Sequence, residues 1–199
     1  MTRGPKKKFD REEVLEKAMQ LFWRQGYEAT GMSELLTEMG IGRQSLYDTF
    51  GDKRSLYLEA LRHYFEGRIA LAREILGRRG SPLGNLRAMF EAFLEITAES
   101  GFCGCFVGNT MAEFGHRDPE VEEITSAFLE RYRLALLGVL ERAQEAGELP
   151  PQVSPGDLAQ MLVVTSQGLA LLSKIKPEES LEMAGSVLRT SFAMLERSA

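Results

Sequence analysis

The 199-residue sequence has little of several residue types on which whole classes of protein depend. Its two cysteines are too few for a disulfide framework. Its two histidines, His63 and His116, are accompanied by no phosphate-binding glycine loop and no nucleophile motif, so we expect no enzyme. Cys103 and Cys105 with the distant His116 also lack the paired spacing of a structural zinc site. We therefore expect neither a metal nor any other cofactor.

Long apolar runs are missing as well. No stretch reaches the roughly 18 apolar residues of a membrane span. The first residues carry a basic arm, Arg3, Lys6, Lys7 and Lys8, without the apolar segment of a secretory signal. The expected location is the cytoplasm, with no membrane contact.

Almost the whole chain has the apolar periodicity of helices, and no convincing strand alternation or internal repeat is present. Helix starts are marked by caps: Asp10, for example, precedes Glu13 at capping-box spacing, and Gly26 ends the same helix. We predict an all-α fold of nine helices, at about residues 11–25, 33–39, 43–50, 53–76, 82–99, 105–114, 119–146, 154–173 and 177–197.

The most informative stretch is residues 30–56. Two short helices are joined by Gly40-Ile41-Gly42, a sharp turn with one apolar residue, and a third helix follows at once. The second short helix places Leu46 and Phe50 four residues apart on an inward side and leaves polar residues outside. This pattern is typical of a helix-turn-helix, whose second helix enters the major groove of DNA. The alternative is an ordinary helical hairpin with solvated polar residues.

Within this motif, residue chemistry predicts particular DNA contacts. Arg43 suits a bidentate contact with guanine and Gln44 one with adenine. Lys53, in the first turn of the next helix, is positioned to hold a phosphate together with the exposed N–H groups there. The predicted DNA-binding set is Thr30, Ser33, Arg43, Gln44, Ser45, Tyr47, Thr49 and Lys53.

The net charge of −5 is unevenly distributed along the chain. Residues 1–57 hold 10 Lys and Arg against 9 Asp and Glu, a net of +1, whereas residues 58–199 hold 14 against 20, a net of −6. The acidic excess is thus separate from the helix-turn-helix. Because +1 is a small total, DNA affinity has to come from the placement of charges, with Arg43, Lys53 and Arg54 around the motif.

The helix-turn-helix and its surroundings resemble the TetR family of transcriptional regulators. Four positions depart from that family's usual pattern: Gly31, Leu36, Met39 and Thr49. The family's N-terminal signature is matched here by Gly26-Tyr27, Thr30, Gly40-Ile41, Leu46-Tyr47, Phe50, Lys53 and Leu56.

The resemblance implies a DNA-binding domain at residues 1–57 and a domain for effector binding and dimerisation at residues 58–199. It also implies a homodimeric repressor, released from a palindromic operator in double-stranded DNA by a small-molecule effector. Carried over by position, the family's phosphate contacts fall on Thr30, Tyr47 and Lys53, and its base contacts on Arg43 and Gln44.

Two further groups of residues are candidates for the effector site and the dimer interface. Aromatic residues in the middle helices would line an effector pocket, although the same pattern is typical of plain core. The predicted pocket set is Phe90, Phe93, Phe102, Cys105, Phe106, Asn109, Phe114, Phe128 and Tyr132. The last two helices carry a wide apolar face that either joins two subunits or is buried within one. The predicted interface set is Leu158, Leu162, Thr165, Leu169, Leu172, Val187, Leu188, Ser191 and Leu195.

Two alternative functions remain open at this point. Cys105 lies near a helix start, where the helix dipole favours a thiolate, so Cys103 or Cys105 would sense oxidants or electrophiles. The competing interpretation is that both are small buried residues. The other alternative is a helical ligand-binding or partner-binding protein that no longer binds DNA.

Overall fold

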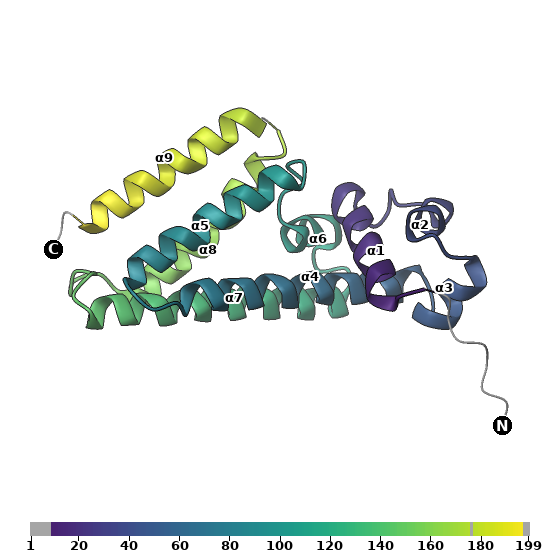
Figure 1. The fold of residues 1–199 in the computed structure, drawn as a ribbon, viewed down its shortest axis with the longest axis horizontal. Helices are drawn as coiled ribbons and strands as arrows, with labels where there is room; N and C mark the ends of the chain where they lie inside the picture. Colours follow the sequence, from purple (N-terminus) through teal and green to yellow (C-terminus); the bar gives the residue numbers. More distant parts are fainter. Residues whose placement is uncertain (1–8, 176, 197–199) are drawn as a thin grey trace, which may run out of the picture. The chain divides into compact units, whose positions relative to one another are not determined.

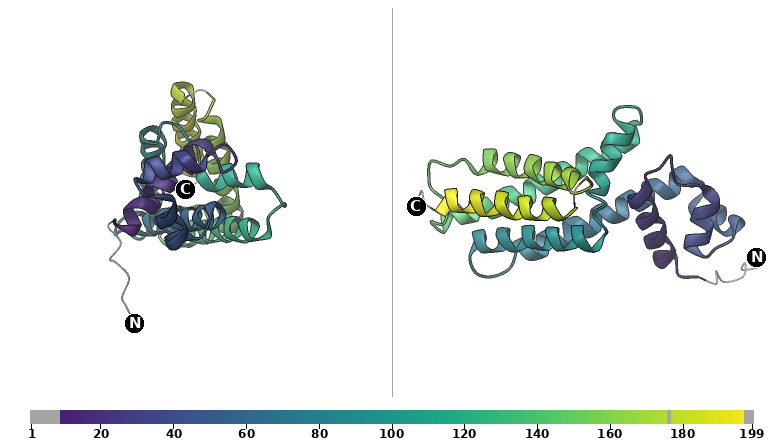
Figure 2. Two further views of the ribbon diagram at one scale, coloured as in Figure 1. Left: turned by 90° about the vertical axis from the view of Figure 1, so that its right-hand side faces the viewer. Right: turned by 90° about the horizontal axis from the view of Figure 1, so that it is seen from above.

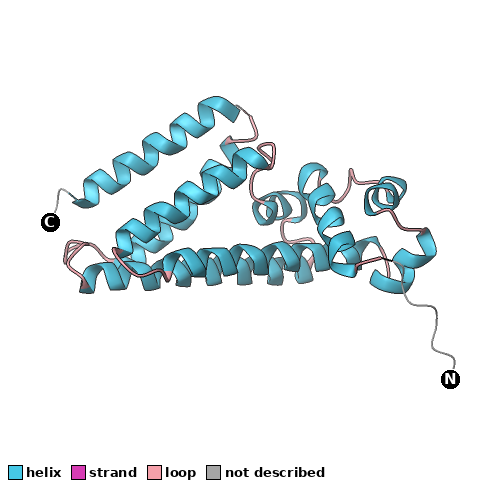
Figure 3. Ribbon diagram, in the orientation of Figure 1, coloured by secondary structure: helices cyan, strands magenta, loops and turns pink. Residues whose placement is uncertain are grey.

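Nine helices and no strand are found in the computed structural model, which describes residues 9–175 and 177–196 (Figures 1 and 3). The predicted all-α fold is confirmed. The predicted basic arm of Arg3, Lys6, Lys7 and Lys8 lies outside the described residues. None of the helices in the described ranges is both long enough and apolar enough to span a membrane. The helices are α1 Arg11–Gln25, α2 Met32–Met39, α3 Arg43–Phe50, α4 Lys53–Leu76, α5 Pro82–Glu99, α6 Phe106–Phe114, α7 Pro119–Glu145, α8 Pro155–Leu172 and α9 Pro177–Glu196.

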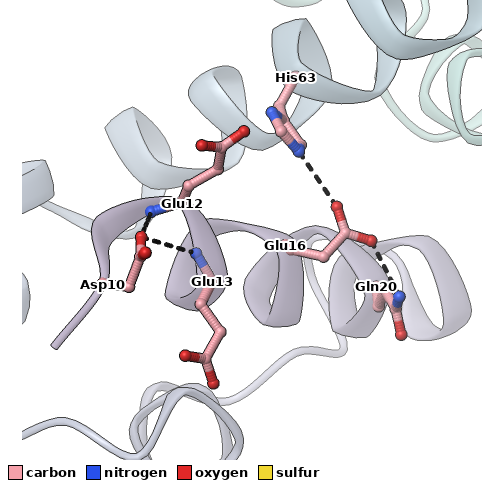
Figure 4. Close-up of polar contacts among 6 residues, drawn as sticks. All are labelled: Asp10, Glu12, Glu13, Glu16, Gln20 and His63. Carbon is pink, nitrogen blue, oxygen red and sulfur yellow. Dashed lines mark hydrogen bonds and ion pairs between the residues drawn. The ribbon is translucent and has the colours of Figure 1, made fainter.

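Helix caps explain why the helix starts were predictable. The Asp10 carboxylate accepts hydrogen bonds from the backbone N–H groups of Glu12 at 2.8 Å and Glu13 at 3.4 Å (Figure 4). The predicted capping box is only half formed, because the Glu13 side chain pairs with Lys17 at 2.6 Å instead. A cap of this kind stabilises a helix by about 1 kcal/mol. The start of α2 differs by one residue from the prediction, since Gly31 caps it without a side-chain bond.

The chain forms two compact units, residues 1–65 and 66–199. Their boundary falls within α4, later than the division after residue 57 that the sequence predicted, because α4 continues without a break past that point. In the first unit, Phe22 of α1 meets Tyr57 of α4 edge-on, with ring centroids 5.0 Å apart. Leu35 of α2 and Leu46 of α3 are fully buried in the same unit. These contacts hold the two short helices in place.

Polar contacts also join α1 to the first half of α4. Glu16 Oε2 lies 3.1 Å from His63 Nε2 (Figure 4), and Arg11 Nη2 lies 2.5 Å from Glu59 Oε1. The Arg11 guanidinium also lies 5.0 Å from the ring centroid of Phe50, the last residue of α3. Arg11 thus connects the end of α3 to α4 within the first unit.

The second unit is a helical bundle. In it α7 packs along α8 and against α5 and α6, while α9 packs on α5 and α8 (Figure 2). Its core includes Leu86 and Phe90 of α5, Phe106 of α6, and Leu136 and Leu140 of α7. This packing brings the aromatic residues of the middle helices to one core.

The segment between α5 and α6 lies very close to α8. Gly104 has a φ of +74°, and a Cβ added there would lie 2.8 Å from the Ala170 carbonyl oxygen. A larger residue would have to push the start of α6 away from α8, since backbone atoms do not approach a Cβ this closely.

Candidate functional site

The turn between α2 and α3 is tight because glycine allows it. Gly40 adopts the left-handed conformation, with φ of +67° and ψ of 29°, which most other residues avoid. The Ile41 N–H then donates to the Leu36 carbonyl at 3.2 Å, closing the end of α2. Gly42 follows as the N-cap of α3. The predicted helix-turn-helix is therefore present.

The exposed face of α3 is formed by two rows of side chains, each one helical turn long. Arg43 and Tyr47 make one row, and Gln44 and Asp48 make the other; all four are exposed, Tyr47 by 43%. Gln44 Nε2 donates to Asp48 Oδ1 at 2.8 Å. Sequence analysis missed Asp48, although its spacing of four residues from Gln44 was the signal that would have found it.

Three of the predicted DNA-contact residues are less available than their positions suggested. Ser45 and Thr49 are half-buried, and Thr49 Oγ1 donates to the Ser45 carbonyl of its own helix at 2.6 Å. Thr30 is only 1% exposed, and its hydroxyl donates to the Gly26 carbonyl at 2.6 Å. The Thr30 hydroxyl therefore closes the loop before α2 inside the unit. Ser33, on α2, is exposed.

Lys53 is the first residue of α4 and is half-buried. Its Nζ lies 4.3 Å from the ring centroid of Tyr27, a cation–π contact that orients the ammonium group. The preceding residue, Asp52, accepts a hydrogen bond from the Ser55 N–H at 2.7 Å, and that bond lowers the pKa of the Asp52 carboxyl. An ionised cap thus stands next to Lys53 in the chain.

Models of two protein domains match the two units of the chain. Residues 14–60 match the family of bacterial regulatory proteins of the tetR type, and residues 82–185 match the tetracyclin repressor-like C-terminal domain. The chain belongs to the TetR family. TetR proteins are helix-turn-helix transcriptional regulators, and the main functional prediction is therefore confirmed at that level.

Similarity to individual TetR regulators extends along most of the chain. The helix-turn-helix-type regulator YezE of Bacillus subtilis (strain 168) is 33% identical over 174 residues, which cover 86% of this chain and 90% of YezE. The helix-turn-helix-type transcriptional repressor ComR of Escherichia coli (strain K12) is 30% identical over 196 residues, covering 94% and 91%.

Solved TetR structures have the same fold. A regulator from Agrobacterium tumefaciens superposes with a TM-score of 0.83 at 21% identity, covering 92% of this chain and 96% of that one. A cysteine mutant of the TetR regulator CifR, in complex with 26-bp double-strand operator DNA, has a TM-score of 0.75 at 26% identity, covering 94% and 98%. Operator DNA is therefore seen bound to a protein of this fold.

The predicted effector residues of this TetR chain divide into two groups. Phe90, Cys105, Phe106, Phe128 and Tyr132 are buried, whereas Phe93, Phe102, Asn109 and Phe114 are half-buried.

Tyr132 is the one buried phenol among them. Its ring stacks on Phe128 with centroids 6.1 Å apart. Its hydroxyl lies 3.2 Å from Ser166 Oγ, which itself donates to the Leu162 carbonyl at 2.6 Å. Because the serine has a single proton, Tyr132 is the donor in this pair. Burial raises the pKa of Tyr132 to about 12, so the phenol is neutral near pH 7.

The polar residues of the α5–α6 segment already have partners within the chain. Asn109 Nδ2 donates to the Cys103 carbonyl at 2.8 Å, and Asn109 Oδ1 accepts from Lys174 at 3.1 Å. Cys105 is 5% exposed and its sulfur accepts from the Gly108 N–H at 3.5 Å, while Cys103 donates to the Ser100 carbonyl. These contacts support a structural role for both thiols.

Most of the predicted interface residues face the interior of their own protomer or are partly covered by it. Leu158, Leu162, Leu169 and Leu188 are buried within the second unit, whereas Leu172 is exposed. The α8 sequence is apolar nearly all round, so periodicity did not separate its inner face from its outer one. Of the remaining predictions, Thr165, Val187 and Ser191 are half-buried, and the Leu195 side chain lies outside the described residues.

The outer face of α8 carries a different apolar row. Val164 is 64% exposed and Ile175, just beyond the helix, is 72% exposed. Steps of three and four residues place this row on one side of the helix. Its members are Met161, Val164, Gly168, Leu171 and Ile175, with Leu172 beside them, and all are exposed. We call them the α8 outer row.

Proposed function

We propose that the protein is a homodimeric repressor that binds a palindromic operator through α3 and is released by a small-molecule effector. The observation that carries this proposal is the exposed face of α3, where Arg43, Gln44 and Tyr47 stand outward from a helix held rigidly by Leu46 and Phe50. These residue types match the donors and acceptors of the major groove. The protein would then act on DNA in the cytoplasm as a regulator and not as an enzyme.

Dimerisation is supported by the α8 outer row. Monomeric proteins rarely leave a continuous row of large apolar side chains in water, since each costs about 1.5–3 kcal/mol relative to burial. Small or short side chains on the outer side of α9, among them Ser186, Thr190 and Ala193, would allow close approach of a second copy. We therefore assign the dimer contact to the outer faces of α8 and α9, and only Leu172 of the predicted set belongs to the exposed row.

A two-fold dimer has a geometric consequence for the operator. The two copies of α3 would enter successive major grooves on one side of the duplex, about 34–36 Å apart. The operator would then consist of two inverted half-sites whose centres are about one helical turn apart.

The effector is proposed to bind among α5, α6 and α7, against the aromatic residues around Phe128 and Tyr132. An apolar organic molecule with one group able to bond a hydroxyl would suit this lining. Such a molecule releases DNA only to the extent that it binds the two conformations of the protein with different affinity, typically by 1–3 kcal/mol.

One experiment tests the DNA-binding part of the proposal. The purified full-length protein would be used to select sites from a random double-stranded library, and the selected duplex would be titrated at several salt concentrations. We expect an inverted repeat and a steep loss of affinity with salt, because lysine and arginine displace counterions from phosphates. Recovery of random sequences, or binding that is independent of salt, would contradict it.

A further inference from the structure

Asp48 is an acidic side chain on the exposed face of α3. The helix has one other charged residue, Arg43, so it brings no net charge to DNA. In a groove lined by phosphates, a carboxylate weakens binding to every sequence unless it gains a hydrogen bond from a base.

The contact between Asp48 and Gln44 determines how the Gln44 amide is turned. A carboxylate only accepts hydrogen bonds, so the atom of Gln44 that lies 2.8 Å from Asp48 Oδ1 has to be the amide nitrogen. The second N–H bond and the carbonyl oxygen of Gln44 remain to form the bidentate pair with adenine. Asp48 therefore orients Gln44 before DNA is bound.

The second oxygen and the unused lone pairs of Asp48 need a donor when water leaves the groove. The major-groove edges of guanine and thymine offer acceptors, and adenine places its N7 acceptor beside its amine. Cytosine offers only its N4 amine, which makes it the base that fits a carboxylate. Side chains one helical turn apart have Cβ atoms about 5–6 Å apart, which spans about two base pairs at 3.4 Å each.

We propose that Asp48 determines operator specificity by accepting a hydrogen bond from a cytosine N4 amine, within about two base pairs of the adenine contacted by Gln44. This inference rests on the proposed function, because it requires α3 to enter the major groove. It names one base of the half-site that the family resemblance does not.

Site selection by four full-length proteins tests the inference: wild type, Asp48→Asn, Gln44→Ala and Glu12→Gln. We expect a cytosine in each wild-type half-site. In Asp48→Asn, the preference for that cytosine should fall about fivefold to tenfold, because an amide both donates and accepts. Affinity for unrelated DNA should rise at the same time. Gln44→Ala should lose the adenine and keep the cytosine.

Glu12→Gln is the matched control. It removes the same charge from an exposed position on α1 of the same unit, so it should leave the selected sequence unchanged. A wild-type site that Asp48→Asn selects without change would overturn the inference alone. Loss of the cytosine in Gln44→Ala would also overturn it, because Asp48 would then act only through Gln44. If wild type selects no site, the proposed function fails as well.

Discussion

The outward faces of α3 and α8 are exposed to water in the protomer but differ in chemistry. α3 presents Arg43, Gln44, Tyr47 and Asp48, which are stable in water and bind through charge and hydrogen bonds. α8 presents an apolar row that is stabilised only when something covers it. The difference indicates two kinds of partner, a polar nucleic acid for the first unit and a second protein chain for the second unit.

The comparison also shows how exposure changes the meaning of a pattern. On α3 few residues are apolar, so Leu46 and Phe50 identify the inner side without ambiguity. On α8 both sides are apolar, and the outer row was not distinguishable from the inner one by spacing. The variants below either break this contrast or sharpen it.

The largest effect is expected from Leu171→Glu in the α8 outer row. Burying a carboxylate where an apolar side chain would be covered should raise the dimer dissociation constant by about 100-fold or more, equivalent to roughly 3 kcal/mol. Sedimentation equilibrium measures this change. Leu134→Glu, at a leucine of α7 that is also exposed, is the matched control and should leave the dimer intact. Equal behaviour of the two variants would remove the contrast between α8 and other surfaces.

On α3, Arg43→Ala should relax the sequence preference, with a loss of about 1–3 kcal/mol of discrimination per half-site. Lys53→Ala should instead weaken binding to all sequences and reduce the slope of log K against log salt by about 0.9 for each phosphate that is no longer neutralised. Titration of the selected operator and of single-base variants, at several salt concentrations, separates the two effects.

Lys17→Ala is the control for charge in this pair of measurements, since Lys17 is paired with Glu13 on α1. It should change neither preference nor slope. If Arg43→Ala behaved like Lys53→Ala, the assignment of Arg43 to a base would be wrong.

A smaller effect separates Tyr47 from Thr49. Tyr47→Phe should lower operator affinity about threefold to tenfold, since it removes one hydrogen bond from an exposed hydroxyl. Thr49→Ala should change affinity less than about twofold, because the Thr49 hydroxyl already donates to Ser45. Mobility-shift titrations with one operator compare them directly, and the reverse order would show that α3 presents its other side to DNA.

The smallest effect concerns Asp52, which caps α4 directly after α3. Asp52→Ala should lower the free energy of unfolding by about 1 kcal/mol at pH 7. Because the folded-state pKa of Asp52 is lowered, this contribution is present above the unfolded pKa of about 3.8 and is lost as pH falls through the folded value. Denaturant unfolding at pH 7 and near pH 3 measures the loss.

Asp52→Asn is the matched control for this titration. Asparagine caps a helix about as well as aspartate but does not titrate, so its contribution should not change with pH over the same window. A pH dependence that persists in Asp52→Asn would assign it to another group.

Much of the fold was predictable because helix starts and ends depend on local chemistry. Asp10, Ser81, Asp118 and Ser154 each accept hydrogen bonds from the N–H groups of the next turn, and these bonds involve residues two or three positions away. The turn at Gly40 is local in the same sense. Such contacts are visible in the order of residues alone.

The candidate sites were predictable only in part, because availability depends on distant residues. Thr30 matched the family signature, yet it is buried and its hydroxyl is used by Gly26. Asn109 was polar and well placed, yet Lys174, far along the chain, bonds its oxygen. A sequence pattern lists the groups that are present but not the groups already bonded to one another.

The sequence by itself therefore determined the helices, the helix-turn-helix and the family, since each depends on short-range spacing and on residue types. Only the tertiary structure decided which sides of those helices face water. It separated the α8 outer row from the inner face and brought Asp48 into view beside Gln44. The physical reason is that burial and hydrogen bonding are shared between segments, so the exposure of a side chain depends on its neighbours in space as well as on its position in the chain.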